Sequence, residues 1–538
     1  MNKPAWWRNG IVYQIYPRSF ADSNKDGIGD LPGITAKLDY LADLGIDAIW
    51  LSPINPSPDV DFGYDVSNYL DIDPKYGTLA DFDKLVAEAH RRGIKIVLDL
   101  VLNHSSDQHE WFKSARQSKD SPYHDYYLWR DPSPNGGQPN NWSSVFGGKG
   151  WEYVPELGQY YFHMFYKEQP DLNWQNPKVR QALLDVFRFW LARGADGFRL
   201  DVFNCYYKDA GFRSNPARIG IRAFDQQDHV YDINQPEMVP LVEEIRQIVD
   251  TNPDGYVIGE TFISTADKAA FYSAPGRLHA AFNFELLECP WKPDKFLKKI
   301  QSWEQALDTG GWPNWVLNNH DNPRSATRFG RGEDDLRLKA AAAILLTLRG
   351  TVFMYYGEEI GMRDVPISRS EVMDPIGKRY WPIFKGRDGC RAPMQWDATS
   401  NAGFSQAKPW LKLNQDYPQR NVAAQKSEPN SLFYFYRKLI QLRKELPALR
   451  DGMFLPLTYD PKRIFAYLRK TDTQSVIVAV NFSSKPTRFF LGREAAKNNW
   501  QPVLSNYPDR VPEIRNSELM LLKDEVCILV SNEPEKSR

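Results

Sequence analysis

Carboxylates stand directly after short apolar segments at several points of this sequence, where they could do acid–base chemistry. In residues 197–201 (GFRLD), Arg199 precedes Asp201 by two positions. Side chains at i and i+2 of a β-strand point to the same face, so Arg199 would lie beside Asp201. A neighbouring arginine favours the charged form of a carboxylate, and a nucleophile requires that form. An ordinary salt bridge at the end of a strand is the alternative interpretation.

Two further carboxylates end apolar segments in the same way. Glu260 ends residues 256–260 (YVIGE), and Asp321 ends residues 315–321 (WVLNNHD). Three carboxylates without a Ser/His pair or a metal-type His cluster suggest hydrolysis of a glycosidic bond, which needs one ionised carboxylate and one protonated acid. Asp201 suits the ionised role. Glu260 has no cation nearby in the sequence and would face two other carboxylates, which raises its pKa. Glu260 therefore suits the acid/base role, and Asp321 is left to stabilise the positive charge that develops on the sugar.

A loop near the N-terminus has oxygen-bearing side chains at alternate positions, which is typical of sites for a hard cation. The predicted ligands of a structural Ca²⁺ or Mg²⁺ are Asp22, Asn24, Asp26, Ile28 and Asp30. Gly27 permits a tight turn, but Gly33 stands where an EF-hand has its bidentate glutamate, so the loop is not a complete EF-hand. A solvated turn is the alternative. We expect no organic cofactor.

Strand-like and helix-like segments alternate through most of the chain. Strands are expected over residues 11–20 and near residues 46, 94, 197, 256, 281, 315 and 351, and helices at 34–45, 79–93, 176–194 and 334–349. Eight parallel strand–helix units close into a (β/α)8 TIM barrel, an α/β fold whose active site lies at the carboxyl ends of the strands. These ends are where Asp201, Glu260 and Asp321 stand.

Two regions break this alternation. Residues 105–175, after the third strand, are rich in Pro, Gly and Asn, and they predict an inserted domain. From about residue 454 the pattern changes to short strands, at 463–471, 474–483 and 526–532, which predict a C-terminal antiparallel β-sandwich. The expected division is a barrel of residues 1–104 and 176–453, an inserted domain of 105–175, and a β domain of 454–538.

Composition excludes several classes of partner. A net charge of −1 gives no reason to expect nucleic acid or an anionic membrane surface. The four cysteines lie far apart without a CxxC pair, so we expect free thiols in a reducing compartment. The N-terminus has no apolar run of signal-peptide length, and no segment approaches the roughly 18 apolar residues of a membrane helix. A soluble, cytoplasmic monomer or homodimer is expected.

Taken together, these segments resemble the α-amylase superfamily, in its oligo-1,6-glucosidase and α-glucosidase branch. The resemblance rests on GIDAIWLSP (45–53), DLVLNH (99–104), QPDLN (169–173), GFRLD (197–201), GE (259–260), NNHD (318–321) and GTVFMYYGEEIG (350–361). It implies a retaining hydrolase with Asp201 as nucleophile, Glu260 as general acid/base and Asp321 as stabiliser of the transition state. It also implies that 105–175 is the family's domain B and the C-terminal strands its domain C.

The same resemblance implies which residues would hold the non-reducing glucose. They are Asp61, Tyr64, His104, Arg199, His320 and Arg387, with Phe146 and Phe165 as walls that exclude water. Charged and imidazole groups can bind vicinal hydroxyls, and a tyrosine offers a ring for stacking. Core packing or a surface ion pair is the alternative for each of them.

The implied activity is that of an exo-acting retaining α-glucosidase on short α-glucosides, with some transglucosylation. Val202, directly after Asp201, and QPDLN look like members that act on α-1,6 bonds, so α-1,6 is favoured over α-1,4. The alternatives are a dedicated α-glucosyltransferase or a sucrose-acting enzyme on the same scaffold. Residues 322–330 (NPRSATRFG) lack the usual pattern of sucrose-isomerising relatives. A non-catalytic, transporter-associated relative is the remote alternative, because such relatives lack the acidic triad and have a membrane helix.

Overall fold

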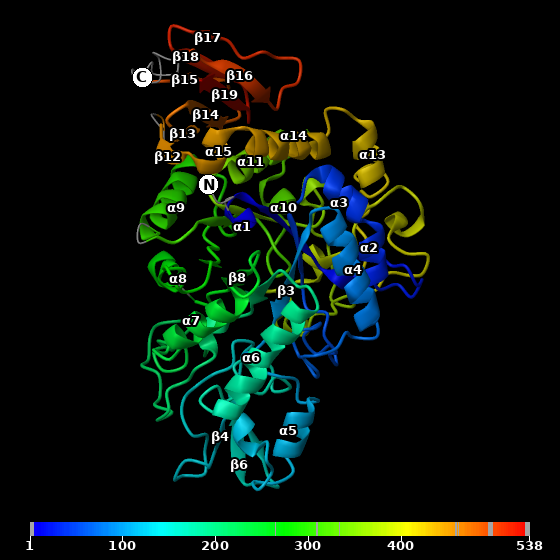
Figure 1. Cartoon of the computed structure of the whole chain (residues 1–538), viewed down its shortest axis with the longest axis vertical. Coiled ribbons are helices and arrows are strands. Elements are labelled where there is room, and N and C mark those ends of the chain that lie inside the picture. Colours follow the sequence, from blue (N-terminus) through cyan, green and yellow to red (C-terminus); the bar gives the residue numbers. More distant parts are fainter. Residues whose placement is uncertain are drawn as a thin grey trace.

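Eight parallel strands form the centre of the protein in a computed structural model (Figure 1). The structure describes residues 5–263, 265–307, 310–332, 334–457, 460, 462–492 and 499–532. The strands are β1 (Ile11–Ile15), β2 (Ala48–Leu51), β3 (Lys95–Leu100), β7 (Gly197–Leu200), β8 (Tyr256–Gly259), β9 (Ala280–Ala281), β10 (Asn314–Val316) and β11 (Thr351–Tyr355). Their order is β10-β11-β1-β2-β3-β7-β8-β9. The predicted (β/α)8 barrel is confirmed.

The two ends of this sheet order, β9 and β10, meet at a seam held by one amide side chain. Asn314 donates from Nδ2 to the carbonyl of Ala281 at 2.6 Å, and its Oδ1 accepts from the backbone N–H of Asn283 at 3.3 Å. Since β9 has only two residues, it offers few backbone groups for pairing. A side chain therefore bridges the one weakly paired position of the barrel.

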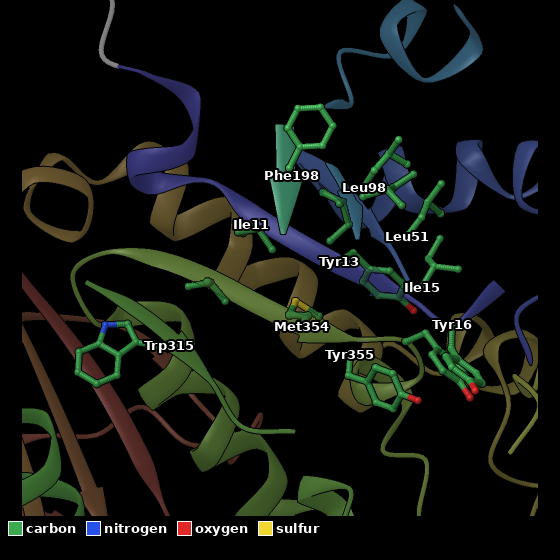
Figure 2. Close-up of a cluster of buried hydrophobic side chains, with 14 of the residues drawn as sticks. Ile11, Tyr13, Ile15, Tyr16, Leu51, Leu98, Phe198, Trp315, Met354 and Tyr355 are labelled. Atoms are coloured by element: carbon green, nitrogen blue, oxygen red, sulfur yellow. The ribbon is translucent and has the colours of Figure 1, made fainter. Parts of the chain in front are cut away.

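Alternation along the strands divides the apolar side chains into two layers. Ile11, Tyr13 and Ile15 of β1 pack with Phe198 and Met354 in the layer between the strands and the helices (Figure 2). The intervening positions, such as Val12, Trp50, Val97, Ile258 and Phe353, form a separate cluster inside the barrel. Because Phe198 and Leu200 of β7 face the helices, Arg199 and the following Asp201 face the interior and its mouth.

Helices surround the strands, and several of them begin at capping residues that can be recognised in the sequence. They include α4 (Leu79–Arg91), α6 (Pro177–Ala192), α7 (Met238–Val249), α8 (Ala266–Tyr272), α9 (Pro293–Ala306), α11 (Leu336–Thr347) and α14 (Leu432–Glu445). Thr78 and Asp81 form a capping box at the start of α4, and Asn176 caps α6 ahead of Pro177. Each helix turns an apolar face to the barrel, such as Phe82 and Leu85 of α4.

Two sequence predictions differ from the structure in detail. The segment 34–45 was predicted as one helix, but it forms α2 (Leu31–Ala36) and α3 (Leu38–Leu44). The Thr35 hydroxyl donates to the carbonyl of Leu31 at 2.9 Å, a side-chain bond that bends helices. The first strand, expected over residues 11–20, ends at Ile15 because Pro17 begins a short 3-10 helix and cannot donate to a strand ladder.

Two antiparallel regions flank the barrel, at opposite ends of the molecule in Figure 1. Within 105–175, β4 (Trp129–Arg130), β6 (Gln159–Phe162) and β5 (Trp151–Val154) form a three-stranded sheet. At the C-terminal end, β12 (Met453–Pro456), β13 (Ile464–Lys470), β14 (Gln474–Asn481), β19 (Val526–Asn532) and β16 (Gln501–Ser505) form one sheet, and β15 (Thr487–Phe490), β18 (Glu518–Leu521) and β17 (Ile514–Arg515) form another. One apolar cluster includes residues of both C-terminal sheets, such as Ile477 and Leu519. The exact domain limits stay a prediction.

The cysteines and the helices bear on two further expectations. All four cysteines are buried free thiols. Among the residues that the structure describes, no helix is long and apolar enough to cross a bilayer. The cytoplasmic location and the oligomeric state stay predictions.

Candidate active site

A cavity of about 210 Å³ opens at the carboxyl ends of the strands. Asp201 follows β7 and Glu260 follows β8 directly, while Asp321 ends the segment after β10. Nine of the predicted site residues line the cavity: Asp61, Tyr64, His104, Phe146, Phe165, Asp201, Glu260, Asp321 and Arg387. Arg199 and His320 lie behind this lining and are almost fully buried. The structure therefore brings together residues that are far apart in the sequence.

Arg199 contacts three carboxylates and not one. Its Nη1 donates to Asp99 Oδ1 and to Asp201 Oδ1, each at 2.7 Å, and its Nη2 donates to Glu260. Glu260 has no cation nearby in the sequence, but in the structure Arg199 lies beside it. β7 and β8 are neighbouring strands, and Arg199 lies opposite Ile258. Glu260, two positions after Ile258, therefore comes within reach of the Arg199 guanidinium.

Burial raises the pKa of both central carboxyl groups, Asp201 and Glu260. Burial raises the pKa of Glu260 to about 8, although Arg199 opposes this shift. Burial likewise raises the pKa of Asp201, to about 7, against the charge of Arg199. A hydrogen bond between the two lowers the pKa of Asp201 and raises that of Glu260. Asp201 therefore has the lower pKa of the two, but burial outweighs the charge of Arg199, which was expected to keep Asp201 ionised.

The third carboxylate has a different electrostatic environment. Burial alone would raise the pKa of Asp321, but His320, Arg387 and Arg391 hold it well below its usual range. Arg391 Nη2 lies 2.8 Å from Asp321 Oδ1, and Arg387 Nη1 lies 3.3 Å from the same atom. Asp321 is therefore ionised at neutral pH.

His320 orients its neighbours and does not line the cavity. Gln14 Nε2 lies 2.7 Å from Nδ1 of His320, so this amide donates to the ring and leaves the proton on Nε2. His320 Nε2 lies 2.7 Å from the hydroxyl of Tyr64, which donates to Asp99 at 3.1 Å, and the two rings are stacked. Burial lowers the pKa of His320 to about 3, so the imidazole is neutral at neutral pH.

The far wall of the cavity combines an ion pair with aromatic rings. Arg387 Nη2 lies 2.7 Å from Asp61 Oδ1, and its guanidinium lies 5.8 Å from the ring of Phe146. The ring centroid of Phe165 lies 5.6 Å from that of Phe146 and 5.1 Å from that of His104. A fixed guanidinium–carboxylate pair beside apolar walls can bind neighbouring sugar hydroxyls while excluding water.

Several residues of the site were not predicted from the sequence. Arg391 binds Asp321. Asp374 binds Arg387, because its Oδ2 accepts a hydrogen bond from Arg387 Nε at 2.9 Å. Further lining comes from Val145, Phe262, Ile376 and Phe384, and also from Val202, which the sequence had indicated only for linkage preference. Arg391 stands in the same GRDGCRAPMQW segment as Arg387, which was the available signal. Asp374 and Phe384 come from an irregular segment without a pattern.

The predicted cation loop is folded by its own hydrogen bonds. Asp22 accepts from the backbone N–H groups of Lys25 and Gly27 at 2.7 and 2.9 Å. Asp30 caps α2 through Gly33 N–H at 2.6 Å and also accepts from Ser23. In the described part of the chain, no group of three or more His, Cys, Asp or Glu side chains is arranged to hold a metal ion. The oxygen donors suit a hard cation in type, and the ion stays a prediction.

Comparison with known proteins extends over the whole chain. The family description "Alpha amylase, catalytic domain" matches residues 14–452. An oligo-1,6-glucosidase of Parageobacillus thermoglucosidasius is 40% identical over 551 residues, which cover 96% of this chain and 97% of its own. An alpha-glucosyl transfer enzyme of known structure has a TM-score of 0.92 and 39% identity, covering 98% of this chain and 100% of its own. A mutant of the isomaltulose synthase of Erwinia rhapontici NX5, solved with sucrose, has a TM-score of 0.89 and 36% identity, with coverage of 98% and 100%.

Proposed function

We propose that this chain, which belongs to the α-amylase family and is a glycoside hydrolase of the α-glucosidase and oligo-1,6-glucosidase type, releases single glucose units from the non-reducing ends of short α-glucosides with retention of configuration. The comparisons with known proteins confirm the family membership that the sequence motifs indicated, and they confirm the enzyme class. The proposal of exo action with retention is supported by the roles that the sequence suggests for Asp201, Glu260 and Asp321.

The contact of Asp201 and Glu260 with one guanidinium is the observation on which the proposal rests. Both carboxyl groups bind Arg199 and lie within hydrogen-bonding reach of each other. Retaining glycosidases hold their two carboxyl groups about 5 Å apart, whereas inverting enzymes leave room for a water between them. A close pair supports a covalent glucosyl-enzyme route.

The reaction follows from these protonation states. Asp201 attacks the anomeric carbon while Glu260 donates its proton to the leaving oxygen, and a glucosyl ester of Asp201 forms. Glu260, now ionised, takes a proton from water, whose oxygen attacks the same carbon and releases Asp201. Asp321 stabilises the oxocarbenium-like charge in both steps.

The size of the cavity supports an exo action. A cavity of about 210 Å³ lined by Asp61, Phe165 and Arg387 has room for about one sugar ring. We expect small α-glucosides as substrates, with α-1,6 bonds preferred over α-1,4 bonds because Val202 borders the bond to be cleaved. A sugar hydroxyl can replace water in the second step, so some transglucosylation is expected. The similarity to an alpha-glucosyl transfer enzyme favours a glucosyltransferase as the second candidate.

A product assay tests the proposal. The purified protein is incubated with isomaltose, maltose and sucrose, and free glucose, transfer products and the anomer released first are followed by NMR. We expect α-glucose first, with isomaltose the best substrate. Release of β-glucose first would contradict retention, and transfer products in large excess over glucose would favour the second candidate. Conversion of sucrose to an isomer would favour the sucrose-acting alternative.

A further inference from the structure

A second and larger cavity, of about 810 Å³, adjoins the active site. The two cavities share Val145, Glu260, Phe262 and Asp321 in their linings. Glu260 protonates the leaving oxygen in the proposed mechanism. The larger cavity therefore lies where the leaving group, or aglycone, of a bound glucoside would extend.

Exposed aliphatic side chains border this second cavity. Ile219 is 99% and Ile221 is 96% exposed, and Ile263 is 49% exposed. All three line the same cavity. Single exposed apolar residues are common on proteins, whereas several around one cavity next to a catalytic acid mark a surface that an apolar ligand can cover.

The loop that bears Ile219 and Ile221 is closed and held in shape. Its base is a bridge between Ala217 and Gln227, with a hydrogen bond from Arg218 N–H to the carbonyl of Gln226 at 2.9 Å. At the tip, a Cβ on Gly220 would come within 2.2 Å of the Asp225 carbonyl, so this close turn requires glycine.

The inner side of the same loop is anchored to the barrel side of the cavity. Phe224 is almost fully buried and stacks on His229 at 3.9 Å. Oδ2 of Asp232 lies 2.9 Å from Nδ1 of His229. Nε of Arg222 lies 2.8 Å from Oδ2 of Asp225. The loop therefore buries its aromatic side and presents its isoleucines to the cavity without needing to rearrange.

We infer that Ile219 and Ile221 form an apolar aglycone site, so that the enzyme cleaves and forms α-glucosides of hydrophobic alcohols in addition to those of sugars. This inference rests on the proposed function. In cleavage, the alcohol leaves with the proton of Glu260. In formation, the alcohol oxygen attacks the anomeric carbon of the glucosyl ester, its proton passes to Glu260, and the bond to Asp201 breaks.

The charges around the cavity disfavour an anionic leaving group such as a phosphorylated sugar. Because Glu260 is protonated in the proposed mechanism, the lining has three carboxylates, Asp225, Glu288 and Asp321, against two arginines, Arg218 and Arg222. The one histidine of the lining, His229, is paired with Asp232. A neutral apolar chain meets no such repulsion.

The test compares kcat/KM for methyl and hexyl α-D-glucosides in the wild type and in the double variant Ile219→Ser, Ile221→Ser. We expect the wild type to prefer the hexyl glucoside by about tenfold or more, because several methylenes leave water. In the double variant this ratio should fall about fivefold or more. With hexanol as acceptor, the yield of hexyl glucoside should fall in parallel.

The matched control is Ile383→Ser. Ile383 is 95% exposed and lines neither cavity, so this variant should keep the wild-type ratio. An equal preference for both glucosides in the wild type, an unchanged ratio in the double variant, or an equal loss in Ile383→Ser would each overturn the inference. Failure of the wild type to release glucose from any α-glucoside, isomaltose included, would instead refute the proposed function.

Discussion

Arg391 is fully buried and places its Nη2 2.8 Å from Oδ1 of Asp321. The same side chain donates from Nε to the carbonyl of His320 at 2.8 Å. One arginine thus fixes both the backbone before Asp321 and its carboxyl group. Because Arg391 does not line the cavity, its part in the proposed mechanism is to position Asp321.

Replacing Arg391 should therefore affect both catalysis and the dependence of stability on pH. Asp321 has a lowered pKa in the folded state. Its stabilising contribution is therefore fully present above its unfolded pKa and is lost as the pH falls from that value through its lower folded pKa. We expect Arg391→Met to lower kcat and to lower Tm at pH 7, with a smaller Tm difference from wild type below about pH 4. Arg391→Lys should restore part of both. A Tm difference that stays constant with pH would contradict this account of the ion pair.

Asp201→Asn should abolish activity while leaving the fold intact. An amide of the same shape cannot form the glucosyl ester, so the release of nitrophenol from 4-nitrophenyl α-glucoside should fall about 10⁴-fold or more. Asp99→Asn is the matched control, since Asp99 binds the same arginine but does not line the cavity. It should lose much less activity. Full activity of Asp201→Asn would falsify the mechanism.

The pH profile of kcat/KM should be bell-shaped, with limbs that belong to the pair Asp201 and Glu260. Glu260 must be protonated to donate, and its pKa is raised to about 8, so activity should fall as the pH rises past that value. Asp201 must be ionised, and its pKa is raised to about 7, so activity should also fall at lower pH.

The variant Glu260→Gln separates the two limbs. Fluoride leaves without a proton, so this variant should react far better with α-glucosyl fluoride than with isomaltose and should lack the alkaline limb. An alkaline limb that persists with the fluoride would show that another group causes it.

Val202 provides a test of linkage preference. It follows Asp201, lines the cavity, and has a φ of 34°, in a region that β-branched residues rarely adopt. Val202→Ala should lower the ratio of kcat/KM for isomaltose over maltose several-fold, since a smaller side chain opens the subsite next to the cleaved bond. Val202→Ile, which keeps the branch, should keep the ratio. An identical ratio in both variants would remove Val202 as a determinant.

Cation binding can be tested through thermal stability. If Ca²⁺ or Mg²⁺ binds the loop of Asp22, Asn24, Asp26, Ile28 and Asp30, then EDTA should lower Tm by a few degrees and added Ca²⁺ should restore it. Asp26→Ala should abolish this response while leaving the cap of α2 intact, because Asp30 forms that cap. A Tm independent of EDTA in the wild type would show that hydrogen bonds alone hold the loop.

Local patterns in the sequence were sufficient to predict the barrel and to place three carboxyl groups at its mouth. Strand alternation has a period of two residues, so GFRLD by itself determined that Arg199 and Asp201 share a face and that Phe198 packs behind them. The carboxyl ends of parallel strands meet at one mouth, which is why the strand pattern alone was enough to place Glu260 and Asp321 with Asp201. Capping residues such as Asn176 and Thr78 likewise act over three or four positions.

Contacts between distant segments could be known only from the tertiary structure. The binding of Arg199 to Glu260 depends on the register of β7 against β8, and the neutral state of His320 depends on its burial against Tyr64 and Gln14. The placing of Arg391 against Asp321, of Asn314 across the barrel seam, and of the Ile219 loop beside Glu260 follows from packing alone. Such contacts have no sequence period, because side-chain hydrogen bonds and burial are set by where segments meet in space and not by their spacing along the chain.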